Sequence, residues 1–64
     1  MITCEFIESG LVRVNDKSVH LDMSGNWIGA NLNLYEAEAF RMFLKMREIS
    51  GGRLQKSEFS FKKS

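Results

Sequence analysis

Proline is absent from these 64 residues, and cysteine and histidine occur once each. Without proline, nothing in the chain marks a rigid linker between two domains. The single cysteine, Cys4, excludes a disulfide within the chain and a zinc site built from several cysteines, and it favours a cytoplasmic protein. No apolar run is long enough to span a membrane. Glu5 and Glu8 interrupt the start of the chain, so we expect no signal peptide.

The composition is that of a small globular domain, with 44% hydrophobic and 27% charged residues. Sixty-four residues make one domain near the lower limit for independent folding. We expect residues 1–53 to form this domain. Residues 54–64 have a different, basic composition, and we expect either a tail or a strand added to the edge of the sheet.

Residues 33–49, NLYEAEAFRMFLKMREI, form the longest segment with a helical pattern. Ala, Leu, Met, Glu, Lys and Arg dominate it, and these residues favour helix. Asn33 suits the N-cap position, and Glu36 stands three residues later, where its carboxylate closes a capping box. Gly51 and Gly52 supply a stop, because glycine readily adopts the left-handed conformation of a C-cap. We predict one helix around which the rest of the chain is organised.

Apolar side chains cover more than half of the circumference of this predicted helix, in two stripes. The longer stripe consists of Tyr35, Ala39, Met42, Phe43, Met46 and Ile49. The shorter stripe consists of Ala37, Phe40 and Leu44. A helix on a small sheet needs one stripe about 100° wide, so we expect Phe40 and Leu44 to face the sheet. The longer stripe is the predicted interface with a second copy or another protein, and the alternative is that the C-terminal segment covers it.

Three segments near the start alternate apolar and polar residues as strands do, namely residues 2–8, 11–15 and 18–23. The last two flank a polar turn and predict a hairpin, with Asp16 and Lys17 at its tip. This register pairs Val14 with Val19, Val12 with Leu21, and Arg13 with His20. It places the apolar residues of the hairpin on one face of the sheet.

Residues 27–32 follow a turn at 24–26 and predict either a short fourth strand or an irregular crossover, since Gly29 disfavours a regular strand interior. The elements together predict an α+β domain. Its core is a small antiparallel meander of three to four strands followed by one long helix packed on one face. The order is β-β-β-(β)-α, with a C-terminal strand as the remaining option.

No residues form a recognised catalytic, metal-binding or nucleotide-binding motif. His20 falls on the polar face of its strand, where a solvated histidine is favoured over a ligand with distant partners. Cys4 is expected to be a small buried hydrophobe, and Trp27 is expected to close one end of the core rather than anchor an interface. We therefore expect neither an enzyme nor a bound cofactor or metal.

The C-terminal segment carries the one feature typical of nucleic-acid binders, because aromatic and basic side chains together can stack on bases and follow phosphates. These side chains are Arg53, Lys56, Phe59, Phe61, Lys62 and Lys63. A domain-wide positive charge is missing, since the formal net charge is +1. The alternation around the two phenylalanines favours an added strand instead.

We therefore expect a small non-enzymatic interaction protein that acts as a homodimer and modulates another macromolecule, as a bacterial or phage regulator or inhibitor would. The alternative is a small nucleic-acid-binding protein that uses the C-terminal segment and a strand face. Salt separates the two hypotheses, because phosphate binding weakens steeply with salt whereas an apolar interface does not. A membrane partner is not expected.

Overall fold

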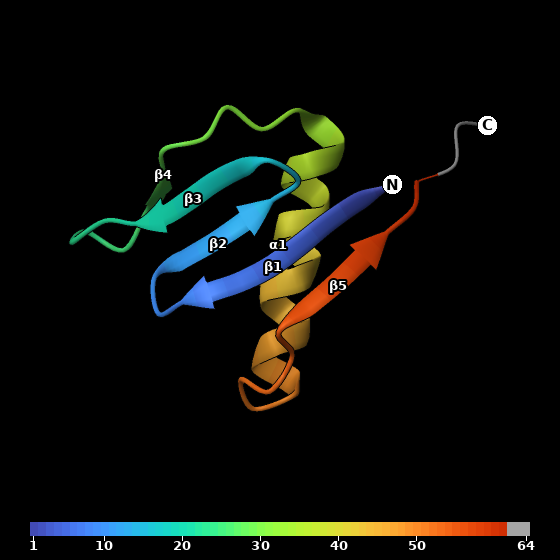
Figure 1. Ribbon diagram of the computed structural model, residues 1–64. Helices are drawn as coiled ribbons and strands as arrows, with labels where there is room; N and C mark the ends of the chain where they lie inside the picture. The colour runs from blue at the N-terminus through green and yellow to red at the C-terminus, as the bar shows by residue number, and fades with distance from the viewer. Residues whose placement is uncertain (62–64) are drawn as a thin grey trace.

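The computed structural model describes residues 1–61, and within them the chain forms five strands and one helix (Figure 1). The elements are β1 (Ile2–Glu8), β2 (Leu11–Val14), β3 (Lys17–Leu21), β4 (Trp27–Ile28), α1 (Leu34–Ile49) and β5 (Lys56–Phe59). The predicted α+β class, with a meander followed by a helix, is confirmed. The optional strands are both present, although β4 has only two residues.

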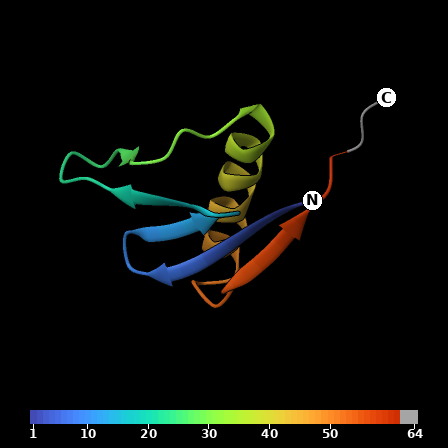
Figure 2. The ribbon, with the colours of Figure 1, turned by 45° about the horizontal axis from the view of Figure 1, so that its top comes forward.

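The five strands form one antiparallel sheet in the order β4-β3-β2-β1-β5. The first four strands are a meander, and β5 returns after the helix to pair with β1. Helix α1 crosses one face of this sheet, and among residues 1–61 no element covers the opposite face (Figures 1 and 2). The strands β4 and β5 are the two edges.

The helix begins and ends where the sequence predicts. Asn33 accepts a hydrogen bond from the Glu36 backbone at 2.8 Å, and the Glu36 carboxylate accepts one from the Asn33 backbone at 3.0 Å, which completes the capping box. After Ile49, Gly51 and Gly52 have φ of 71° and 83°. Their N–H groups donate to carbonyls of the last turn, as at other glycine-terminated helices.

The predicted hairpin exists, but its register is wrong by two residues. Val12 lies opposite Val19, and Val14 lies opposite Lys17. Arg13 pairs with Ser18, and Leu11 pairs with His20. The turn is Asn15-Asp16 because Asn15 takes a left-handed φ of 54°, which asparagine tolerates well. The backbone of Asn15 also donates to the Thr3 carbonyl at 2.8 Å, which fixes the turn one residue earlier than predicted.

A shift by two residues leaves each side chain on its predicted face, because strand side chains alternate with period two. The buried apolar core is therefore close to the predicted one. It consists of Ile2, Cys4, Val12, Val14, Val19, Ala39, Phe40, Phe43 and Phe59. Leu21 is the exception and is exposed. In the observed register it pairs with Trp27, and its N–H donates to Gly10 in the β1–β2 turn, beyond the end of the β2 ladder.

Candidate interaction surface

The helix presents the strip between its two apolar stripes to the sheet, rather than the shorter stripe alone. Ala39 and Phe43, from the longer stripe, are fully buried, and Phe40, from the shorter one, is nearly so. The placement of Ala39 and Phe43 in a partner interface was therefore wrong, because both lie in the core of the single chain. One sheet face therefore covers the adjoining sides of both stripes, which carry Ala39, Phe40 and Phe43.

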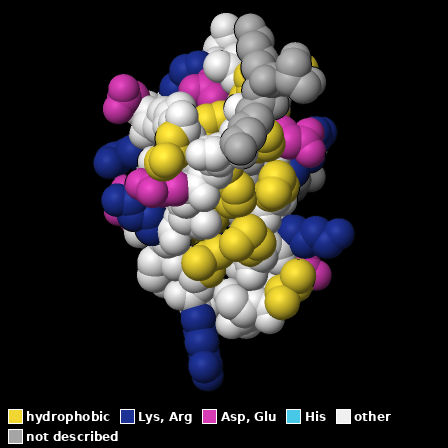
Figure 3. Space-filling model, turned by 90° about the vertical axis from the view of Figure 1, so that its right-hand side faces the viewer, with side chains coloured by type: hydrophobic (Ala, Val, Ile, Leu, Met, Phe, Trp, Pro, Cys, Tyr) yellow, Lys and Arg dark blue, Asp and Glu magenta, His cyan; other side chains and the backbone are white. Residues whose placement is uncertain are grey.

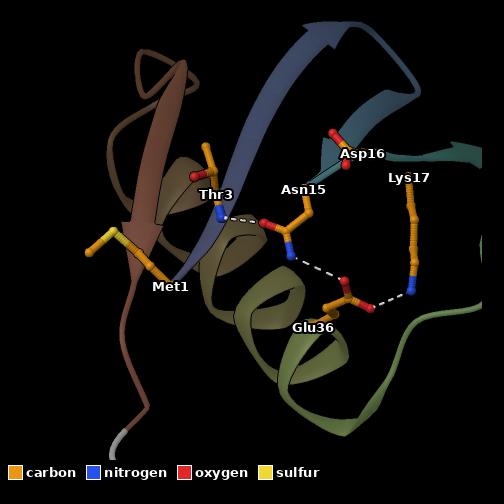
Figure 4. Close-up of a pocket in the computed structure, with 6 residues that line it drawn as sticks. All are labelled: Met1, Thr3, Asn15, Asp16, Lys17 and Glu36. Atoms are coloured by element: carbon orange, nitrogen blue, oxygen red, sulfur yellow. Dashed lines mark hydrogen bonds and ion pairs between the residues drawn. The ribbon is translucent and has the colours of Figure 1, made fainter.

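A polar anchor fixes this rotation at the start of the helix (Figure 4). Glu36 lies on the sheet-facing side and is almost completely buried. Its two carboxylate oxygens accept hydrogen bonds from Lys17 at 2.7 Å, from the Asn15 side chain at 3.1 Å and from the Asn33 backbone at 3.0 Å. Asn15 in turn accepts from the Thr3 backbone at 3.0 Å. The carboxylate thus joins α1 to the β2–β3 turn and to β1.

This anchor borders an open hollow of about 490 Å³, lined by Met1, Thr3, Asn15, Asp16, Lys17 and Glu36. The hydrogen bond from Lys17, with those from Asn33 and Asn15, lowers the pKa of Glu36 to about 2 although burial opposes this. A carboxylate that is ionised and fully hydrogen-bonded is a poor proton donor and a weak base at neutral pH. The arrangement stabilises the fold and supplies no evident acid–base chemistry.

A second polar side chain, Arg47, faces the sheet near the end of the helix. Its guanidinium carbon lies 3.7 Å from the centre of the Phe6 ring, in a cation–π contact. Its guanidinium also donates to the Leu54 carbonyl, so it holds the segment that leads into β5. Glu36 and Arg47 both lie between the apolar stripes, and their polar partners allow that strip to face the sheet.

One flank of the helix is covered by the crossover between β3 and α1. The rings of Trp27 and Phe40 meet edge to face, with centroids 5.2 Å apart. Ala30, Leu32 and Leu44 also pack against the core here. The predicted role of Trp27, which is to close one end of the core, agrees with this contact.

The opposite flank faces the β5 side and remains largely uncovered. Four side chains of the longer stripe are exposed there, namely Tyr35, Met42, Met46 and Ile49. Tyr35 alone has an aromatic neighbour, because its ring centroid lies 5.7 Å from that of Phe61. In Figure 3 hydrophobic side chains gather in a band on this side of the molecule, with Lys, Arg, Asp and Glu side chains on both margins. We call these four residues the exposed flank.

Of the six residues predicted for nucleic-acid contact, the four that the structure describes do not form one surface. Phe59 is buried in the core beside Ile2, its partner in the β1–β5 ladder, so it cannot stack on a base. Phe61 is half-buried against Tyr35. Arg53 and Lys56 are exposed. Lys62 and Lys63 lie outside the described residues.

Cys4 and His20, the remaining candidates for a reactive side chain, lie in surroundings that do not activate them. Cys4 is fully buried, and burial raises the pKa of its thiol to about 11, so it is an unreactive thiol in the core. His20 is exposed on the open face between Leu11 and Ile28, not beside Arg13 as predicted. Residues 1–61 contain no group of three His, Cys, Asp or Glu that could hold a metal ion. They also contain no helix that is long and apolar enough to cross a membrane.

The contacts of Glu36 with Lys17 and Asn15 are not among the sequence-based predictions. Two signals could have found them. Lys17 shares a strand face with Val19, which marks a polar residue directed toward the core. Glu36 stands between two apolar stripes, where a carboxylate needs a partner. The two residues have opposite charges and lie at the same end of the fold, where they pair.

A search of protein-family models, of curated proteins and of solved structures finds no match to this chain.

Proposed function

We propose that this chain is a small interaction protein that forms a homodimer and binds another macromolecule, whose activity it modulates. The observation that supports the proposal is the exposed flank. Met42 and Met46 stand there with about 40% of their surface exposed, between the exposed Tyr35 and Ile49. An apolar patch on one side of a small domain favours protein–protein contact, and methionine adapts well to a partner surface.

The polar anchor also limits how the helix can rotate. Turning the exposed flank toward the sheet would withdraw Glu36 from Lys17 and Asn15 and break the hydrogen bonds that join α1 to the β2–β3 turn. The exposure of the flank is therefore set by the fold. A cytoplasmic location, where a free thiol such as that of Cys4 is ordinary, belongs to the same proposal.

Sedimentation of the unmodified protein from low to high micromolar concentration tests the homodimer. We expect a concentration-dependent dimer, and we expect the double variant Met42→Lys, Met46→Lys to remain folded and monomeric. The matched control is Leu21→Lys, Ile28→Lys, which changes two side chains that are 44% and 45% exposed at the other edge. A monomer at every concentration, or equal loss of the dimer in both double variants, would contradict the proposal.

A further inference from the structure

Strand β5 presents one free edge beside the exposed flank. Among residues 1–61 it pairs only with β1. The N–H of Phe6 donates to the carbonyl of Gln55 at 2.7 Å. Because hydrogen-bonding direction alternates along an antiparallel strand, Gln55 and Ser57 direct their backbone groups to β1. Lys56 and Glu58 direct theirs outward. An exposed row of this kind is a template for another strand.

The charges along the β5 edge favour one register when β5 pairs with β5 of a second copy. In an antiparallel pair of two β5 strands, the outward-directed residues face each other across the two-fold axis. Three registers overlap the strands well. One places Glu58 opposite Glu58, and a second places Lys56 opposite Lys56, so that like charges repel. The third places Lys56 of each copy opposite Glu58 of the other and forms two complementary charge pairs.

We propose that β5 pairs antiparallel with β5 of a second copy in this third register, so that the two sheets become one continuous sheet. Four backbone hydrogen bonds would join Lys56 and Glu58 of the two copies. Ser57 would meet Ser57 of the second copy on the axis. Ser57 lies opposite the buried Cys4 and therefore on the helix side of the sheet, where its small side chain leaves room beneath the junction.

The same pairing brings the two exposed flanks together. A two-fold axis perpendicular to the sheet keeps both helices on one face. If each helix lies beneath β1, which it contacts most closely, three strand spacings separate the helices by about 14 Å. A helix with its side chains is about 10–12 Å across, so the long side chains of Met42 and Met46 would fill the space between them. Backbone pairing and apolar burial then support the same dimer.

This inference rests on the proposed homodimer and specifies its geometry. The test is charge reversal. Glu58→Lys and Lys56→Glu each place like charges opposite each other at both pairs, so each variant alone should dimerise at least about tenfold more weakly. Mixed in equal amounts, the two variants should form a heterodimer, because every Lys then faces a Glu. The control is Glu8→Lys, which makes the same charge change on an exposed residue away from this edge.

Amide exchange of the unmodified protein provides a readout that needs no variant. In the dimer, the N–H groups of Lys56 and Glu58 should exchange slowly, and on dilution to monomer they should exchange rapidly. This readout also covers the case in which Lys56→Glu fails to fold, since its new carboxylate would face Glu5 across the β1–β5 ladder.

Three outcomes decide between the proposals. Slow exchange at both amides together with rescue in the mixture supports the strand-paired dimer. A dimer whose Lys56 and Glu58 amides exchange rapidly, and which Glu58→Lys does not weaken, overturns the strand pairing and leaves the homodimer standing. A chain that stays monomeric to high micromolar concentration overturns both.

Discussion

The two flanks of α1 have similar apolar content but different surroundings. On the β4 side, Trp27 packs on Phe40, and Leu32 and Leu44 pack against the core. On the β5 side, Met42 and Met46 stay exposed, although Phe61 packs against Tyr35 and the core. Burial is therefore not a property of the helix pattern alone. It depends on which flank a neighbouring segment can cover, and within residues 1–61 the long crossover lies on the β4 side.

The sheet-facing strip between the flanks makes this asymmetry stable. Glu36 and Arg47 each find partners on other elements, at opposite ends of the helix. A helix held at both ends cannot roll to bury more of one flank without breaking these contacts.

Phe43→Ala should destabilise the fold most, by about 3–5 kcal/mol, because a fully buried aromatic ring leaves a cavity. A loss of this size approaches the whole stability of a small domain, so the variant should be largely unfolded. Urea denaturation followed by circular dichroism measures it. Met46→Ala, one turn away on the exposed flank, is the control. A folded Phe43→Ala with an unchanged midpoint would show that this residue does not lie in the core.

Trp27→Ala removes the cover from the β4-side flank. We expect a loss of about 2 kcal/mol, less than for a fully buried ring because Trp27 is only half-buried. Tyr35→Ala, which removes the aromatic contact of the opposite flank, should cost less than about 1 kcal/mol. Denaturation of both variants at low protein concentration compares the flanks directly. Equal losses of stability in the two variants would show that the two flanks are covered to the same extent.

Glu36→Gln weakens the polar anchor. The folded-state pKa of Glu36 is about 2, against an ordinary value of 4.5. The ionised carboxylate therefore stabilises the fold fully above pH 4.5, and this contribution disappears as pH falls from 4.5 toward 2. The variant should lose about 1–2 kcal/mol at pH 7 and show a flatter decline between those pH values.

Denaturation at pH 7, 4 and 3 measures this effect. The control is Glu38→Gln, because Glu38 is an exposed carboxylate that pairs with Arg41 on the same helix. An unaltered pH profile in Glu36→Gln would show that Glu36 is not the carboxylate whose protonation destabilises the fold.

The smallest effect is expected for Met46→Gln. At protein concentrations below those of association, an exposed side chain of this kind should change stability by no more than about 0.5 kcal/mol. The same polar substitution at Leu44, on the covered flank, should cost clearly more, because Leu44 packs against the core. A large loss in Met46→Gln in the dilute monomer would mean that the β5-side flank is already covered within the single chain.

The helix boundaries and the strand faces could be predicted because they depend on local chemistry. Asn33, Glu36 and the two glycines after Ile49 encode the ends of the helix within a few residues of chain. Alternation encodes which strand residues face inward. The hairpin register escaped prediction, because Asn15 forms hydrogen bonds with Thr3 on another strand and so selects the turn.

The fold class, the helix and most of the core composition follow from short-range signals, since caps, turns and periodicity act over short distances. Which strip of the helix is buried depends instead on contacts between distant parts of the chain. Glu36 and Arg47 look like interruptions of an apolar surface until Lys17, Asn15 and Phe6 are brought next to them. Those partners are distant in the chain. Folding brings them together, and their pairing offsets the free-energy cost of burying a charged side chain. The exposed flank, and the surface it offers to a partner, follow from that pairing.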